Sequence, residues 1–390
     1  MTKIKVVHVI NSFEFGGAEA MLCNLLARAD RDRFEPSVVA LIDDLTVAGP
    51  VRDAGIPLAT MGMRPGVPDP RGLARLARHL ARARPGVVQT WMDHSNLIGG
   101  LACRAATTAP VVWGLHHSGH APGLSKRSTL WTVSACAKLS RRVPARVVCC
   151  SERTRATYAG LGFAPERLTV IPNGFDTDTF RPDPAARLSV RHELGVDPDA
   201  TLIGLVARYD PLKDHANFLH AAALLAPRAP SARFVLCGDR VDAGNAALTG
   251  LIGTLGLADR CRLLGARRDV ARVNAALDVA TSSSVSEAFP LAVGEAMACG
   301  VPCVVTDVGD SARMVGPTGR VVPPRDPEAL RDAWLALLAM DPGDRRRLGL
   351  DARRLVQERY DLGAVTRRYE EIYEGLACGG GAARLVPSRV

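Results

Sequence analysis

Between residues 284 and 302 the chain reads SVSEAFPLAVGEAMACGVP, which sets two glutamates, Glu287 and Glu295, eight residues apart. Residues 276–282 before it are mostly apolar and then small and polar, as at the carboxyl end of a buried parallel strand. From Leu291 onward the small apolar residues predict a helix, which the glycine and proline at its end terminate. Glu287 then lies in the loop before the helix, and Glu295 lies inside it.

Two interpretations of this pair compete. With about 3.6 residues per helical turn, the spacing places both side chains on roughly one face, toward the crevice where open α/β sheets bind ligands. Carboxylates there can accept hydrogen bonds from the vicinal hydroxyls of a sugar and a ribose. Alternatively, Glu287 caps the helix and Glu295 is an ordinary, partly exposed residue, which is the commoner case for an isolated pair. The rest of the chain has to decide between them.

The composition describes a globular chain with a basic surplus. Its 390 residues are more consistent with two domains than with one, and 47% apolar residues provide a core for both. The net charge of 49 − 40 = +9 suits phosphate-bearing ligands or an anionic membrane surface. The ten cysteines form no C-x-x-C pair and no cluster at zinc spacing, so we expect neither a disulfide nor a metal site.

No stretch reaches the roughly 18 to 20 apolar residues of a membrane-spanning helix. The amino terminus also lacks the long apolar core and cleavage site of a signal peptide. We therefore expect a cytoplasmic protein. Residues 70–84 predict a helix whose arginines at 71, 75, 78 and 82 form one basic stripe beside a leucine stripe. This helix is either an ordinary surface helix or, through residues 71–84, a peripheral contact with the anionic inner face of the cell membrane.

Each half of the chain opens with a strand followed by a candidate phosphate site. In the first half, strand-like residues 5–10 lead into Gly16-Gly17 and a helical run, the arrangement in which backbone N–H groups and a helix dipole meet an anion. The loop is not the G-x-G-x-x-G fingerprint, which argues against NAD binding. In the second half, strand-like residues 201–207 run into Arg208 and Lys213. An arginine fork and a lysine point charge at such a junction can converge on a diphosphate.

Strand and helix signals alternate between and after these motifs, which predicts βαβ units and doubly wound parallel sheets. In this order and spacing, Gly16-Gly17, Arg208 with Lys213 and Glu287 with Glu295 resemble the motifs of the retaining glycosyltransferase family 4, including its E-x7-E signature. The resemblance covers about residues 3–375. It implies the GT-B fold, an α/β architecture of two Rossmann-like doubly wound parallel-sheet domains facing across a cleft.

The resemblance also implies a division of labour. Residues 1–172 would form the acceptor-binding domain and residues 173–362 the nucleotide-sugar donor domain. A helix at about 363–377 would lie back on the first domain, and residues 378–390 would form a flexible tail. The pair Asp176-Thr-Asp178 is the kind of metal motif found in the other glycosyltransferase fold, GT-A, but it falls in the linker with no adjacent strand. We interpret it as a coincidence.

The implied reaction is metal-independent, retaining transfer of a sugar from a nucleotide-diphosphate sugar, by family default a UDP-sugar, with no cofactor. The acceptor would be a hydroxyl of a glycan, a lipid-linked molecule or a small molecule, in polysaccharide, lipid-linked glycan or metabolite biosynthesis, and no nucleic acid is expected as a partner. The residues implied as catalytic are His116, Arg208, Lys213 and Glu287. Those implied as donor-binding are Gly16, Gly17, Arg208, Lys213, Gly238, Arg267, Glu287, Phe289, Pro290, Leu291 and Glu295. The candidates for acceptor binding are His94, Asn96 and His117.

Three alternatives stay open on the sequence alone. The same fold serves nucleotide-sugar epimerases. It also serves phosphorylases, which bind pyridoxal phosphate through a lysine that has no evident counterpart here. Finally, the chain could be a binding protein that retains the fold without transfer activity, although the complete set of charged motif residues favours an enzyme.

Overall fold

The computed structural model describes residues 2–14, 16–67, 69–117 and 127–379. The chain forms two compact units, which we call unit 1 (Met1–Gly174 with Leu362–Val390) and unit 2 (Phe175–Asp361). The boundaries expected from the sequence, 172/173 and 362/363, differ from these by two residues and by one residue. The predicted tail, residues 378–390, lies outside the described residues from position 380 onward.

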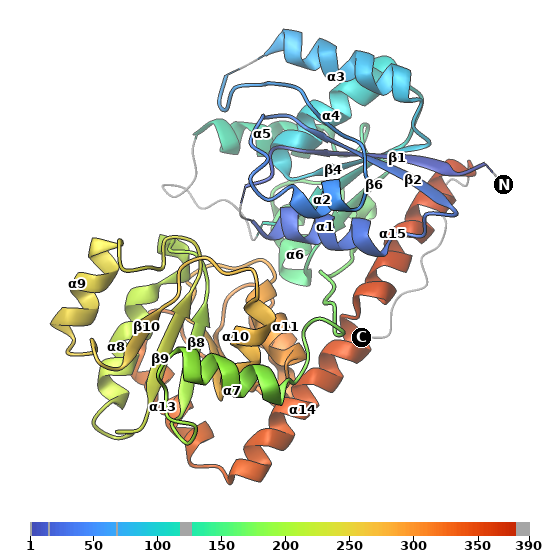
Figure 1. Cartoon of the computed structure of the whole chain (residues 1–390). Helices are drawn as coiled ribbons and strands as arrows, with labels where there is room; N and C mark the ends of the chain where they lie inside the picture. Colours follow the sequence, from blue (N-terminus) through green and yellow to red (C-terminus); the bar gives the residue numbers. More distant parts are fainter. Residues whose placement is uncertain (1, 15, 68, 118–126, 380–390) are drawn as a thin grey trace. The chain divides into compact units, whose positions relative to one another are not determined.

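Unit 1 is a seven-stranded parallel sheet with strand order β3-β2-β1-β4-β5-β6-β7. Helices cover both of its faces (Figure 1). Its elements are β1 (Ile4–Ile10), α1 (Gly17–Arg28), β2 (Phe34–Ala40), α2 (Gly49–Asp53), β3 (Leu58–Thr60), α3 (Pro70–Ala83), β4 (Val87–Trp91), α4 (Asp93–Ala106), β5 (Val111–Leu115), α5 (Arg127–Leu139), β6 (Arg146–Cys149), α6 (Glu152–Gly160), the short 3-10 helix η1 (Pro165–Arg167), β7 (Leu168–Val170) and α15 (Leu362–Ala377).

The alternation of side chains along a strand explains the two layers of this unit. In β1, Val6 and Ile10 enter the core beneath α1 and α15, whereas Val7 and Val9 enter the core beneath α3, α4 and α5. The closing helix α15 buries its apolar face in the first of these cores, so Leu362–Ala377 pack within unit 1.

The last strand of unit 1 has no clear signal in the sequence. Leu168–Val170 form β7 at the edge of the first sheet, in register with β6 and just before the expected domain boundary after residue 172. A three-residue strand beside a proline carries too little pattern to be separated from a linker by sequence.

Unit 2 is a six-stranded parallel sheet with strand order β10-β9-β8-β11-β12-β13. Its core contains Phe218, Phe234 and Trp334, whose rings pack against one another. Its elements are α7 (Pro184–Glu193), β8 (Leu202–Val206), η2 (Pro211–Lys213), α8 (His215–Leu225), β9 (Arg233–Cys237), α9 (Ala246–Thr254), β10 (Cys261–Leu263), α10 (Val270–Ala276), β11 (Val279–Ser282), α11 (Leu291–Ala298), β12 (Cys303–Thr306), α12 (Ser311–Val315), η3 (Gly316–Thr318), β13 (Arg320–Val322), α13 (Pro327–Leu338) and α14 (Pro342–Arg359).

Both sheets have a point where the strand order reverses, between β1 and β4 in unit 1 and between β8 and β11 in unit 2. Open α/β sheets bind ligands beyond the carboxyl ends of the strands at such a point. The predicted Gly16-Gly17 loop follows β1, Arg208 follows β8 and Glu287 follows β11. The topology therefore places these motifs at the switch points of their own sheets.

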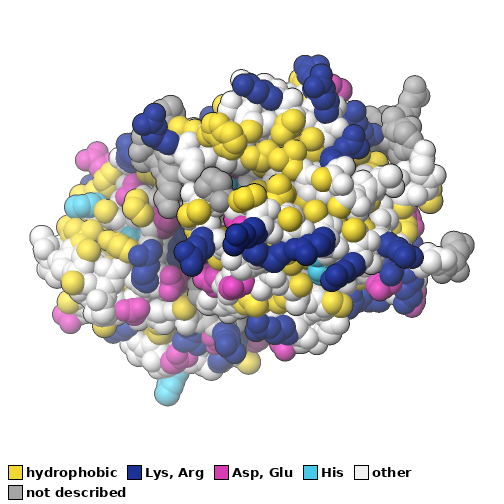
Figure 2. Space-filling model, turned by 90° about the horizontal axis from the view of Figure 1, so that it is seen from above, with side chains coloured by type: hydrophobic (Ala, Val, Ile, Leu, Met, Phe, Trp, Pro, Cys, Tyr) yellow, Lys and Arg dark blue, Asp and Glu magenta, His cyan; other side chains and the backbone are white. Residues whose placement is uncertain are grey.

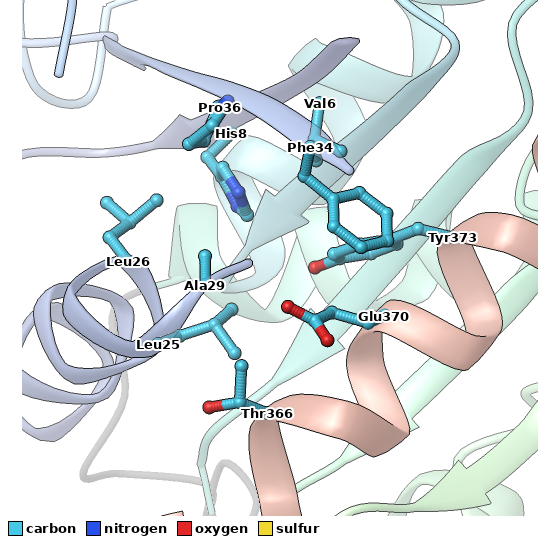
Figure 3. A pocket seen from close by; sticks show the side chains of 10 residues that line it. All are labelled: Val6, His8, Leu25, Leu26, Ala29, Phe34, Pro36, Thr366, Glu370 and Tyr373. Carbon is cyan, nitrogen blue, oxygen red and sulfur yellow. The ribbon is translucent and has the colours of Figure 1, made fainter. Parts of the chain in front are cut away.

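A small apolar pocket lies inside unit 1, where α15 meets α1 and β2 (Figure 3). The carboxylate of Glu370 at its rim accepts a hydrogen bond from the Asp30 N–H (2.8 Å). None of the residues predicted to bind donor or acceptor lines this pocket. Its lining residues are Val6, His8, Leu25, Leu26, Ala29, Phe34, Pro36, Thr366, Glu370 and Tyr373. Among the described residues, no helix has both the length and the apolar character that a membrane crossing requires.

Candidate active site

Lys213 and Glu287 form the centre of the candidate site in unit 2. Because β8 and β11 are neighbouring parallel strands, the loops that follow them meet, although the two residues are 74 positions apart. The Lys213 Nζ lies 2.5 Å from Glu287 Oε1. The Ser284 hydroxyl donates to the same oxygen at 2.7 Å. A cation and a carboxylate predicted to serve one ligand are thus in direct contact.

Hydrogen bonds between the two loops hold Lys213 in place. The Ser283 hydroxyl donates to the carbonyls of Lys213 (2.9 Å) and Asp214 (3.0 Å), and the Val285 N–H donates to the Leu212 carbonyl (2.9 Å). Side chains fixed in this way need little reorganisation when charge develops on a ligand.

Arg208 leaves the end of β8 on the same loop as Lys213. Its side chain is 42% exposed, and its Nη2 lies 3.2 Å from the Asp210 carboxylate. Asp210 in turn accepts from the Leu212 N–H (2.9 Å) and so fixes the turn that leads to Lys213. Arg208 is therefore exposed enough to contact a ligand phosphate. Its partner Asp210 stabilises the loop and leaves the guanidinium accessible.

Glu295 lies in the second turn of α11, the helix that follows Glu287. It is half-buried, and no described residue gives its carboxylate a hydrogen bond or an ion pair. Burial raises the pKa of Glu295 to about 7. Pro290 precedes the helix and no side chain caps it. The Val293 N–H already donates to the Pro290 carbonyl (3.2 Å). In the described part of the chain, the N–H groups of Leu291 and Ala292 have no such acceptor and can meet an anion.

Two further predicted donor residues have mainly structural surroundings. Gly238 has φ +158°, and a Cβ there would lie 2.1 Å from the Ala207 carbonyl, so only glycine allows the loops after β8 and β9 to approach this closely. The Arg267 guanidinium is paired with Asp269 (2.7 Å) and with Glu193. These hydrogen bonds, that to Asp269 first, hold the pKa of Arg267 well above its usual range. Arg267 thus has two acidic partners before any ligand arrives.

In unit 1, the Gly16-Gly17 loop begins α1 as predicted, with Gly16 at the position before the helix. A side chain on Gly16 would lie 2.1 Å from Glu19 Oε2. The Glu19 carboxylate therefore lies against the loop, where the sequence predicts a phosphate. A ligand anion would have to displace it, whereas a ligand hydroxyl could donate to it.

His116 follows β5, and its ring stacks on Trp91 at 5.0 Å between centroids. Trp91 stacks on Tyr369 of α15 in turn. Both ring nitrogens of His116 and the Asn173 Oδ1 are buried and have no hydrogen-bond partner in the described part of the chain. Burial lowers the pKa of His116 to about 4. The ring is thus neutral near pH 7 and rigidly held.

The three predicted acceptor residues differ in their surroundings. Asn96 is fully buried; its Oδ1 accepts from the Thr90 hydroxyl (2.6 Å) and its Nδ2 donates to the Gly114 carbonyl (3.0 Å). Because the side chain is fully buried and both its oxygen and its nitrogen are hydrogen-bonded inside unit 1, its position does not support the predicted role. His94 is half-buried in the first turn of α4, and His117 is half-buried two residues after the end of β5.

The hydrogen bonds of Asp176 in the Asp176-Thr-Asp178 motif stabilise the turn in which the motif lies. One Asp176 oxygen accepts from the Asp178 N–H (3.2 Å), and the other accepts from the Thr179 hydroxyl (2.9 Å). Among the described residues, no group of three or more His, Cys, Asp or Glu side chains is arranged to hold a metal ion.

Comparisons with known proteins address the family directly. The family model described as Glycosyltransferase Family 4 matches residues 15–179, and the model described as Glycosyl transferases group 1 matches residues 200–340. The chain belongs to glycosyltransferase family 4. The first match covers the Gly16-Gly17 loop and His116, and the second covers Arg208, Lys213 and both glutamates of this family 4 protein.

Individual relatives agree with this assignment. A D-inositol 3-phosphate glycosyltransferase of Mycobacterium sp. (strain KMS) is 36% identical over 194 residues, which are 48% of this chain and 43% of that protein. The chain therefore matches less than half the length of this relative. The corresponding protein of Nocardia farcinica is 30% identical over 302 residues, 72% of this chain and 65% of that one. The crystal structure of Anabaena HepE in complex with UDP-glucose superimposes with a TM-score of 0.84 at 23% identity, covering 96% of this chain and 100% of that one. The predicted GT-B fold is confirmed.

Two features of the unit 1 site carry no signal in the sequence. Met92, between β4 and α4, has φ +74° and ψ 159°, a backbone conformation that costs a residue with a side chain about 1–3 kcal/mol. Asp93 is buried and accepts a hydrogen bond from the Tyr158 hydroxyl (3.0 Å). The strained backbone of Met92 and the buried Asp93–Tyr158 hydrogen bond thus lie directly after Trp91, at the same edge of the sheet.

Unit 1 of this family 4 protein is expected to lose stability on mild acidification. Burial lowers the pKa of His8 to about 3 and that of His116 to about 4, from 6.5. Unfolding lets both rings take up protons, so their contribution to stability is complete above about pH 6.5 and is lost as the pH falls toward 4. Hydrogen exchange of unit 1 peptides at several pH values measures this. In a His116→Gln variant the stability of unit 1 should depend less steeply on pH. An unchanged pH dependence would contradict the attribution of this effect to His116.

Proposed function

We propose that this family 4 protein is a metal-independent retaining glycosyltransferase that uses a UDP-sugar. The observation that carries the proposal is the contact between Lys213 and Glu287 on the loops after β8 and β11, with Arg208 beside them and the uncapped α11 following. Cations for a diphosphate and a carboxylate for sugar hydroxyls thus occupy one sheet edge, at its switch point.

The barrier to sugar transfer lies in the departure of the diphosphate from an oxocarbenium-like sugar. Arg208 and Lys213 would stabilise the negative charge that grows on the leaving group, the role that a metal has in other enzymes. Their two positive charges make a metal unnecessary for this step. The backbone at Phe289, Pro290 and Leu291 would approach the sugar and the phosphate, although Pro290 has no N–H to donate.

The two glutamates would hold the donor on either side of the diphosphate. Glu287, already hydrogen-bonded as an acceptor to Ser284, would accept from hydroxyls of the transferred sugar. Glu295, whose carboxylate has no hydrogen-bond partner among the described residues, would accept from the ribose hydroxyls. His116 would orient the sugar as a neutral ring. Retention would follow from attack on the face that the diphosphate leaves, with a leaving-group oxygen as the base.

The relatives suggest which substrates to try first. HepE crystallises with UDP-glucose, and the mycobacterial relative is named for D-inositol 3-phosphate. We propose UDP-glucose as the first donor and a hydroxyl of a glycan, a lipid-linked molecule or a small molecule as the acceptor, in polysaccharide or related biosynthesis.

A panel of nucleotide sugars, assayed for slow acceptor-free hydrolysis, tests the function without knowledge of the acceptor. We expect release of free UDP from at least one UDP-sugar. Conversion of the donor to an isomeric UDP-sugar would instead support an epimerase. Binding of UDP-sugars without turnover, alone or with hydroxyl acceptors, would support a binding protein and contradict the proposal.

We also propose that the α3 face of unit 1 contacts anionic lipid. Arg71, Arg75, Arg78 and Arg82 are exposed along α3. The helix α5 covers the same core beyond α4 and exposes Trp131 to 69%. On this face, Lys and Arg side chains lie among hydrophobic ones (Figure 2). Basic residues attract an anionic surface, and an exposed tryptophan is suited to the boundary between headgroups and acyl chains.

Vesicle binding is expected to depend on this charge. Sedimentation with vesicles of phosphatidylglycerol and phosphatidylcholine should recover the protein, and pure phosphatidylcholine should not. Because each basic residue near the surface contributes about 1 kcal/mol, Arg78→Glu with Arg82→Glu should weaken binding at least about tenfold. The control pair Arg347→Glu with Arg354→Glu, on α14 of unit 2, should leave it unchanged.

Tryptophan fluorescence gives a second measurement on the same vesicles. The other three tryptophans, Trp91, Trp113 and Trp334, are fully buried, so quenching by brominated lipid reports on Trp131. Equal binding to neutral and anionic vesicles, or no quenching of Trp131 in the bound protein, would contradict the contact.

A further inference from the structure

The helix α11, which carries Glu295, is held by an aromatic ring packed directly on its backbone. Gly294 has no side chain, and a Cβ at this position would lie 2.0–2.5 Å from three carbons of the Phe175 ring. Real Cβ atoms do not approach other atoms this closely. The ring therefore occupies the space that any side chain at position 294 would need, one residue before Glu295.

Phe175 is also the residue at which the chain enters unit 2. The first segment of unit 1 ends at Gly174. The chain then forms unit 2 and returns to unit 1 after Asp361. The Phe175 N–H donates to the Tyr360 carbonyl (2.8 Å), and Phe175 pairs with Asp361 as a parallel β-bridge. The two segments that connect the units thus run side by side at the residue that contacts α11.

Two more aromatic side chains complete a cluster, which we call the aromatic clamp: Phe175, Phe289 and Tyr360. Phe175 stacks on Phe289 with 6.1 Å between ring centroids, and the Tyr360 ring meets Phe289 edge-on at 5.4 Å. All three are buried. Phe289 stands between Glu287 and the start of α11, so the clamp contacts the donor motif before the helix and again inside it.

The other end of α11 is tied to the same entering segment. The Arg353 guanidinium donates to the carbonyls of Thr177 (3.0 Å) and Phe180 (2.8 Å), and also to the carbonyl of Ala298, the last residue of α11. Both ends of the helix are therefore fastened to residues 175–180. Ordinary core packing would also bury these rings. It would not require the same helix to contact the segment that enters unit 2 at two separate points.

We propose that the aromatic clamp is a positioning device that sets α11, and with it Glu287 and Glu295, for the nucleotide of the donor. It couples donor binding to the segments that connect the two units. This inference rests on the proposed function. It assigns a positioning role to the three aromatic side chains, which would not themselves contact the donor, whereas the Phe289 backbone would. Small displacements of groups that hold a ligand have large effects, since an error of about 1 Å can cost about 100-fold in rate.

A double-mutant cycle with UDP binding as the readout tests the clamp. Gly294→Ala pushes the Phe175 ring away, and we expect it to weaken UDP binding at least about tenfold. Phe175→Leu leaves a gap beside α11 and should weaken binding by a smaller factor. In the double variant the smaller leucine accommodates the new methyl group, so its UDP affinity should lie above that of Gly294→Ala alone. Residues in direct contact show such non-additive behaviour.

Phe218→Leu is the matched control, because Phe218 is equally buried in unit 2 but packs on Phe234 and Trp334. It should lower the unfolding midpoint without changing the UDP Kd. Isothermal titration calorimetry and thermal unfolding on the full chain give both quantities. If Gly294→Ala does not fold, Phe175→Leu against Phe218→Leu decides the question.

The outcomes separate the clamp from the proposed function. Wild-type protein that binds UDP while both clamp variants bind it within about twofold of wild type overturns the clamp and leaves the function standing. A Phe218→Leu variant that loses as much UDP affinity as Phe175→Leu also overturns it. A wild type that binds no nucleotide overturns the proposed function and the clamp together.

Discussion

Replacement of Lys213 with alanine is expected to lower the rate of UDP release from the best UDP-sugar by about 100-fold or more. In the proposed mechanism Lys213 is the preorganised cation. Its ammonium lies 2.5 Å from Glu287, and hydrogen bonds from Ser283 hold its loop. Loss of one preorganised charge donor typically costs about 10²–10³ in kcat. Arg208→Ala should have an effect of similar size.

The loss should fall mainly on kcat, because the charge on the diphosphate grows as the bond to the sugar breaks. Steady-state kinetics with the donor as the varied substrate separates kcat from KM. Arg354→Ala, an exposed arginine of unit 2 paired with Asp351, is the control and should match wild type. A Lys213→Ala variant that retains more than about one third of the wild-type kcat would argue against this role.

Glu295→Gln is expected to weaken UDP binding about 10- to 100-fold. An ionised carboxylate that accepts from both ribose hydroxyls would contribute about 1.5–3 kcal/mol per hydrogen bond, and an amide accepts only with its single oxygen. Because the pKa of Glu295 is raised to about 7, the wild-type site is only partly ionised at neutral pH. UDP affinity should therefore rise as the pH increases through 7, and binding should release a proton.

The same titration affects stability with the opposite sign. The folded protein holds the Glu295 proton more tightly than the unfolded chain, whose carboxyl has a pKa near 4.5. This contribution to stability is complete below about pH 4.5, and is lost as the pH rises toward 7. Thermal unfolding should show Glu295→Gln gaining stability over wild type across that range. Calorimetry in buffers of different ionisation enthalpy should show less proton release on UDP binding for the variant. Equal release in both proteins would assign the proton to the diphosphate instead.

The fold could be predicted from the sequence because its signals are local and repeated. Strand-like runs at residues 5–10 and 201–207, each followed by a loop and a helix, are enough to indicate two doubly wound sheets. β7 was missed because a strand of three residues has no usable periodicity, and it is stabilised by pairing with β6 rather than by its own pattern.

The candidate site could be predicted only in part. The order of strands in a doubly wound sheet places Lys213 near Glu287, and the structure shows the contact. Other outcomes depend on side-chain partners that sequence spacing does not reveal. Glu193, which lies 74 residues before Arg267 in the sequence, pairs with the Arg267 guanidinium. The Asn96 amide is hydrogen-bonded to the Thr90 hydroxyl and to the Gly114 carbonyl.

One measurement tests the central claim most directly. The protein is incubated with UDP-α-glucose, or with the best donor of the panel, and proton NMR follows the anomeric signals before mutarotation. The account predicts release of UDP together with the α-anomer of the sugar, and a strong reduction of both in Lys213→Ala. First appearance of the β-anomer would contradict retention. Equal, background-level release by wild type and Lys213→Ala with every donor and acceptor would contradict the assignment as a glycosyltransferase.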